Sequence, residues 1–189
     1  YLIGLRQELD ASAVELASDQ EARRAIIART GALLDHARSG ALLPPDSVSL
    51  YLEALTDFRF FTPVRTVLDD LVASGGMALL RSEEARRGLL GYVQEMERLQ
   101  LVEAREREFV ADQVEPWLSR HVPLGELIPL EEGGRVERVD TLAVAALQAA
   151  LDDPELVSLM QLRWRRTDLA LRFAGGVERW IDRAREGLE

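Results

Sequence analysis

The sequence contains no cysteine and no lysine among its 189 residues. The absence of cysteine excludes disulfides, thiolate metal sites and thiol nucleophiles. The absence of lysine excludes Schiff-base chemistry and a phosphate-binding loop of the kind that relies on a lysine. All 23 basic residues are therefore arginines.

Positive charge and long apolar runs are also scarce. The chain carries 33 acidic residues against 23 basic ones, a net charge of -10. This balance argues against a nucleic-acid surface and against direct docking on anionic lipid headgroups. No apolar run is long enough to span a bilayer. A hydrophobic fraction of 47% with 30% charged residues is typical of a globular protein.

Residues that carry chemistry are few. The two histidines, His36 and His121, lie far apart, and neither has a ligand partner three or four residues away. The chain contains neither the Glu-x-x-His pair of di-iron bundles nor a Gly-x-Ser-x-Gly elbow. We therefore predict no catalytic residue, metal site or cofactor, and a metal-assisted enzyme is the least favoured function.

Apolar residues recur at helical spacing along almost the whole chain. The pattern predicts an all-α fold, an elongated antiparallel bundle of three long helices with short connecting helices, in a single domain over residues 1–189. The long helices are expected at residues 1–38, 82–115 and 154–188, and the short ones at 47–56, 63–74 and 141–151.

Three local expectations accompany this pattern. The helix at 63–74 should start with Thr62 as N-cap and Pro63 as its first residue. Its predicted buried side consists of Val64, Val67, Leu68, Leu71 and Val72. Pro116 should kink or end the preceding helix near residue 115. The segment "EAREREF" at 103–109 is charged on nearly every face and suits a solvated stretch.

Residues 123–140 are the one stretch without helical spacing. Glu131-Glu132-Gly133-Gly134 is typical of a turn. Its flanks are predicted to form a small hairpin.

The corner Ser74-Gly75-Gly76 interrupts two helical patterns. A phosphate-binding loop would follow a strand and use a lysine, and neither is present here. The favoured interpretation is a helix C-cap in which Gly75 or Gly76 has positive φ. An anion contact near Arg81 and the following helix start is the alternative.

Three residues are candidate contacts for a ligand or a partner. Arg59 lies within the aromatic-rich "FRFF" stretch and Arg65 follows it, and both could face a small molecule held between helices. Trp164 lies in an Arg-Trp-Arg-Arg cluster, and both residue types are enriched at interface hot spots. The favoured alternative is that Trp164 packs in the seam of the last helix, while the arginines pair with acids or with solvent.

Two segments, "YLIGLRQELDAS" at 1–12 and "FTPVRTVLDDLVASGGMALLRSEEARRGLLGYVQEMERL" at 61–99, resemble a family of small bacterial membrane proteins. The shared pattern is an aromatic-x-Pro entry, a Leu-x-x-Ser-Gly corner and a Leu-Leu-Arg step. Family members have one N-terminal transmembrane helix followed by a helical domain. They usually place a second aromatic beside the tyrosine that corresponds to Tyr92, where this chain has Val93.

The resemblance implies a location: a periplasmic domain on a membrane anchor upstream of Tyr1. It implies no activity and no catalytic residue. Because the chain begins with Tyr1 rather than methionine, we expect it to be part of a longer protein. The predicted function is a non-enzymatic, membrane-anchored interaction or scaffold domain for a protein partner or a second copy. The alternative is a small-molecule-binding sensor bundle.

Overall fold

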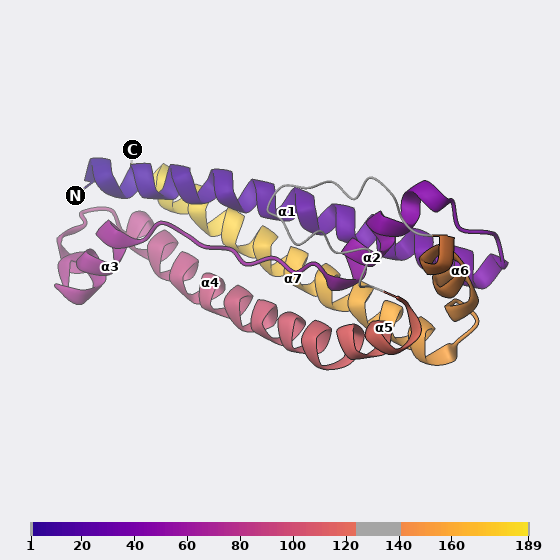
Figure 1. The fold of residues 1–189 in the computed structure, drawn as a ribbon. Helices are drawn as coiled ribbons and strands as arrows, with labels where there is room; N and C mark the ends of the chain where they lie inside the picture. Colours follow the sequence, from indigo (N-terminus) through magenta and orange to yellow (C-terminus); the bar gives the residue numbers. More distant parts are fainter. Residues whose placement is uncertain (1, 124–140, 189) are drawn as a thin grey trace. The chain divides into compact units, whose positions relative to one another are not determined.

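The computed structural model describes residues 2–123 and 141–188, and it confirms the all-α fold. No strand occurs within these ranges. Figure 1 shows the elements in chain order: α1 (Leu2–Ser39), η1 (Pro45–Ser47), α2 (Val48–Thr56), α3 (Thr66–Ala73), η2 (Gly76–Leu79), α4 (Glu83–Phe109), η3 (Val110–Val114), α5 (Glu115–His121), α6 (Thr141–Ala150) and α7 (Pro154–Gly187). The three long helices are confirmed as α1, α4 and α7. The hairpin predicted at 123–140 lies outside the described residues, apart from position 123.

The chain divides into two compact units. Unit 1 consists of Tyr1–Arg23, Arg59–Ala104 and Leu169–Glu189, and unit 2 of Arg24–Phe58 and Arg105–Asp168. Each unit has its own apolar core. In unit 1 this core is built around Leu9, Leu89, Met96, Val177 and Ile181, and in unit 2 around Leu33, Leu55, Trp117, Leu147 and Leu156.

Two long helices begin at the residues that the sequence indicates. The Ser82 hydroxyl accepts the backbone N–H of Ala85 at 3.1 Å, which caps α4. The Asp153 carboxylate accepts the N–H of Glu155 at 2.8 Å and caps α7. In both cases a side-chain oxygen satisfies an N–H group that has no partner inside the helix.

The start of α3 corrects the sequence prediction. The helix begins at Thr66, and residues 61–65 are not helical. The cap comes from another helix, because the Glu8 carboxylate of α1 accepts the N–H groups of Val67 at 2.7 Å and Leu68 at 3.1 Å. Since this acid also complements the positive end of the helix dipole, it sets where α3 starts. The predicted buried side is partly wrong too, because Val64 and Val72 are about half exposed.

The break expected near Pro116 is present as a change in helix type. Residues Val110–Val114 form the π-helical turn η3 between α4 and α5. Proline lacks an N–H and its ring crowds the carbonyl four residues earlier, which lies inside this turn. A wider turn at that point relieves the conflict without ending the helical path.

None of the helices in the described ranges combines the length and the apolar character needed to cross a membrane.

Candidate functional site

Several charged side chains in the middle of the long helices are buried, which corrects part of the prediction of a solvated segment at 103–109. Arg105, Arg107 and Glu108 are exposed as predicted, but Glu103 and Glu106 are not. Glu103 and Glu106 are each only 1% exposed, and Arg23 and Arg163 are 0% exposed. A charge in a protein interior is costly unless it is paired and hydrogen-bonded. The contacts of each arginine therefore show what these residues do.

The Arg23 cluster lies in unit 1. Arg23 donates from Nε to Asp19 at 2.7 Å and from Nη2 to Glu103 at 2.6 Å. Nη2 also donates to the backbone carbonyl of Arg59 at 3.0 Å. The same Glu103 oxygen accepts the N–H of Phe61 at 3.1 Å. The cluster thus fixes two backbone positions of the non-helical segment that precedes α3.

The Arg163 cluster lies in unit 2, and it too combines a buried ion pair with hydrogen bonds to the backbone. Arg163 forms a close ion pair with Glu106 and donates to the Thr167 hydroxyl at 2.9 Å. The Thr167 hydroxyl in turn donates to Glu106 at 2.6 Å. Arg163 also donates hydrogen bonds to the backbone carbonyl of Ala54, at 3.2 Å, and to that of Asp57. These bonds hold the C-terminal end of α2. Both clusters therefore use their charges to fix backbone.

One sequence signal points to these clusters. Asp19, Gln20 and Arg23 fall on the apolar stripe of the first helix, where a charge has no solvated position. Buried charges of this kind occur almost only in pairs. Their partners, Glu103 and Glu106, could not be assigned without the fold, since the pairs join residues 80 and 57 positions apart.

Arg65, a predicted ligand contact, is committed to contacts within unit 1. Its guanidinium pairs with Asp69 at 2.6 Å and donates to the sulfur of Met96 at 3.6 Å. Beside it lies Tyr92, which is 1% exposed. Burial raises the pKa of Tyr92 above its ordinary value of 10.0, and the Ser12 hydroxyl and Arg65 oppose this effect. Arg59, the other predicted contact, has an exposed side chain and a carbonyl held by Arg23.

The Ser74-Gly75-Gly76 corner forms a turn between α3 and η2. Gly75 has φ +69° and ψ 11°, the left-handed conformation that glycine adopts most readily. The N–H of Gly75 donates to the Val72 carbonyl at 3.2 Å. Gly76 is buried, and a Cβ there would lie 2.8 Å from Leu71. The geometry is thus that of a helix end.

Trp164 is partly buried and packs against the core of unit 2. Its indole nitrogen lies 3.8 Å from the position that a Cβ on Gly31 would occupy. Its neighbour Arg163 is the buried arginine of the cluster described above.

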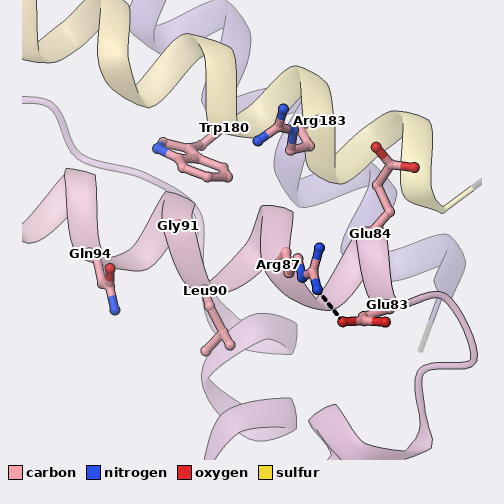
Figure 2. Close-up of a pocket in the computed structure, with 8 residues that line it drawn as sticks. All are labelled: Glu83, Glu84, Arg87, Leu90, Gly91, Gln94, Trp180 and Arg183. Carbon is pink, nitrogen blue, oxygen red and sulfur yellow. Dashed lines mark hydrogen bonds and ion pairs between the residues drawn. The ribbon is translucent and has the colours of Figure 1, made fainter.

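A surface hollow of about 600 Å³ lies in unit 1 between α4 and α7. Figure 2 shows the residues that line it, which we call the α4/α7 hollow: Glu83, Glu84, Arg87, Leu90, Gly91, Gln94, Trp180 and Arg183. Trp180 and Arg183 project from α7, and the other residues belong to α4. The sequence does not bring these eight residues together, because they come from two helices far apart in the chain.

Glycine on α4 creates the floor of the hollow. A Cβ on Gly91 would lie 2.6 Å from a Trp180 ring atom, so the indole packs directly on the helix backbone. One turn earlier, a Cβ on Gly88 would lie 2.6 Å from the Cα of Ala184. The pair of glycines, three residues apart, was the signal available in the sequence for a close helix contact.

The two arginines of the hollow differ in whether a carboxylate is paired with them. Arg87 forms an ion pair with Glu83 (Figure 2). Arg183 instead lies over the Trp180 ring, 5.1 Å from its centroid, in a cation–π contact. Within residues 2–123 and 141–188, no carboxylate forms an ion pair with Arg183.

Over the part of the chain that the structure describes, no three histidine or acidic side chains are grouped so that they could hold a metal ion.

The chain matches no family model, and neither a curated protein nor a solved structure is significantly similar to it.

Proposed function

We propose that this chain is a non-enzymatic interaction domain that binds a protein partner through the α4/α7 hollow. The observation that carries the proposal is the composition of this hollow. A tryptophan and a leucine lie beside two arginines at one surface site, and tryptophan and arginine are the residues most enriched at interface hot spots. Leu90 is 51% exposed there, so apolar surface is available to a partner.

The location of the other charges supports the same function. A catalytic acid or base must reach its substrate. Arg23, Arg163, Glu103 and Glu106 are closed off from solvent and bonded to one another or to backbone. These clusters act on the fold of the chain, which favours an interaction domain over an enzyme.

A small-molecule-binding sensor is the second candidate. The hollow has the volume of an ordinary ligand pocket, for which about 300–1,000 Å³ is typical. Its rim of exposed charged residues suits a protein surface better, because ligand pockets are mostly apolar and enclose their ligand.

We further propose that the domain is membrane-anchored and periplasmic. The support is the resemblance at residues 1–12 and 61–99, and the anchor would be an apolar helix upstream of Tyr1. Fractionation of cells that express the full-length gene tests this proposal. Recovery in the membrane fraction with protease access from the periplasmic side is expected, and recovery in the cytoplasm would contradict it.

A photo-crosslinking amino acid at position 90 tests the partner proposal. Position 101 is the matched control, because Leu101 lies on the same helix and is 55% exposed, close to the 51% of Leu90. In the source cells we expect a discrete crosslinked protein from position 90 that is absent from position 101. The same bands from both positions, or none from position 90, would contradict the proposal.

A further inference from the structure

The α4/α7 hollow has an order of side chains that specifies what its partner presents. On α4, Arg87 lies one turn N-terminal to Leu90 and Gly91. Glu83 and Glu84 lie one further turn toward the N-terminus. Figure 2 shows Trp180 above the Gly91 turn and Arg183 further along α7, toward the glutamates. Gln94 lies one turn beyond Gly91 on the other side, so the lining runs from an amide, past apolar residues and two guanidiniums, to an acidic end (Figure 2).

We propose that the partner is a segment of another protein that places an apolar side chain against Trp180 and Leu90 and a carboxylate on Arg183. This inference rests on the proposed function and names the chemistry of the partner at the same site.

The apolar part of the hollow, at Leu90, Gly91 and Trp180, provides a place for an anchor side chain. Gly91 contributes no side chain, and the indole of Trp180 packs on its backbone. Leu90 is half exposed next to this floor. Covering a tryptophan face and a leucine with one apolar side chain removes apolar surface from water at the centre of the contact, where hot spots are found.

Arg183 explains why the partner carries an acid. The guanidinium of Arg87 is already paired with Glu83, whereas that of Arg183 lies over the ring of Trp180 and forms no hydrogen bond or ion pair with any described residue. A guanidinium stacked on an aromatic ring keeps its edge N–H groups available for two parallel bonds to a carboxylate. Charge complementarity therefore requires a negative group at Arg183.

The two glutamates limit where that negative group lies. Glu83 and Glu84 disfavour a further acid beyond Arg183, because like charges side by side repel. The partner's carboxylate must therefore be close to its apolar anchor. Trp180 and Arg183 are three residues apart on α7, where neighbouring side chains lie about 5–6 Å apart, so a helical partner would carry the two groups three or four residues apart.

Selection from a random peptide library displayed on phage tests this inference. The purified chain serves as bait, and Leu90→Glu serves for counter-selection, since this exposed position changes without disturbing the core. We expect enriched peptides to share an apolar residue with Asp or Glu three or four residues away. Fluorescence anisotropy of one labelled enriched peptide then measures affinity.

Charge reversal gives the sharper readout. Arg183→Glu should weaken peptide binding at least about tenfold, which corresponds to about 1.4 kcal/mol. Arg179→Glu is the matched control, because it makes the same charge change one turn away on α7, outside the hollow, and should change affinity less than about twofold. A peptide whose acid is replaced by lysine should regain binding to Arg183→Glu. Circular dichroism melting confirms that each variant is folded.

The possible failures separate the two proposals. Peptides whose binding requires Leu90 but that carry no acid would overturn the carboxylate inference and leave the interaction site intact. Peptides whose affinity is unchanged by Arg183→Glu would do the same. The absence of any peptide that depends on Leu90 would overturn both. Self-association in analytical ultracentrifugation that Arg183→Glu abolishes would assign the hollow to a second copy of the chain and overturn the inference.

Discussion

At the scale of single residues, the chain stabilises its non-helical segments with buried arginines. Arg163 is surrounded by one carboxylate, one hydroxyl and two backbone carbonyls. A buried pair of this kind contributes little net stability relative to apolar packing, but loss of one partner leaves an uncompensated charge. The cluster therefore determines which backbone conformation is allowed at the end of α2.

Arg163→Met should destabilise the protein by about 3–5 kcal/mol, because Glu106 would stay buried without its counter-charge. The double variant with Glu106→Leu should lose clearly less than the sum of the two single variants. Urea unfolding of the four proteins of the cycle measures this coupling.

The control for this cycle is Arg38→Met. Arg38 pairs with Asp35, but both side chains are exposed, at 67% and 75%, and the melting temperature should not change. A neutral effect of Arg163→Met would show that the buried pair does not hold the fold.

Tyr92 predicts an alkaline limit to stability. Because its pKa is raised by burial, the folded chain keeps the phenol proton to higher pH than the unfolded chain does. The stability from this group is complete below pH 10.0 and falls as pH rises above it. Tyr92→Phe should therefore flatten the decline of melting temperature above about pH 10. The chain has no lysine or cysteine to obscure this change.

Equal slopes for wild type and Tyr92→Phe over that range would mean that Tyr92 ionises without opposing the fold. Tyr51→Phe is the control for the loss of a tyrosine hydroxyl.

At the scale of elements, glycine sets how closely α4 and α7 approach. A Cβ on Gly88 would lie 2.6 Å from the Ala184 backbone, so Gly88→Ala should cost about 1–3 kcal/mol. Gly175→Ala on α7 is the opposite case. The nearest atom to the added Cβ would be a guanidinium nitrogen of Arg179, 3.8 Å away, and a helix prefers alanine to glycine by about 1 kcal/mol. Thermal unfolding should show a loss for the first variant and a gain for the second. A gain for both would mean that the helices do not meet at Gly88.

The corner between α3 and η2 depends on one dihedral angle. Gly75 has φ +69° with open space around it, so Gly75→Val should lose about 1–2 kcal/mol to backbone strain alone. Gly75→Asn should lose less, since asparagine tolerates this conformation. Equal melting of the two variants would argue that the turn adjusts to any residue.

Elements whose signals are local could be predicted from the sequence. Ser82 and Asp153 cap the helices that follow them, and Pro116 lies next to the π-helical turn. The start of α3 could not be predicted, because its cap is Glu8, 59 residues before Val67. A strong local signal, Thr62-Pro63, was overridden by a contact between helices.

At the scale of the whole molecule, the sequence predicts the fold class but not the candidate site. Helical periodicity alone is sufficient for three long helices. The pair Gly88 and Gly91 indicates a close helix contact on α4, but nothing in the sequence identifies Trp180 of α7 as the residue that packs there. Arg65 pairs with Asp69 within unit 1, and Trp164 packs against the core of unit 2, in line with the favoured interpretation of that residue.

The three tryptophans provide the most direct measurement of the central claim, that the α4/α7 hollow is where a partner binds. Trp117 is fully buried, Trp164 packs on the core of unit 2, and Trp180 forms the floor of the hollow. Their indole N–H signals can be followed by ¹⁵N NMR as the protein crosslinked from position 90, or an enriched peptide, is added. We expect the Trp180 signal to shift on binding while those of Trp117 and Trp164 stay in place. A shift of Trp164 with Trp180 unchanged would show that the partner does not bind at the hollow.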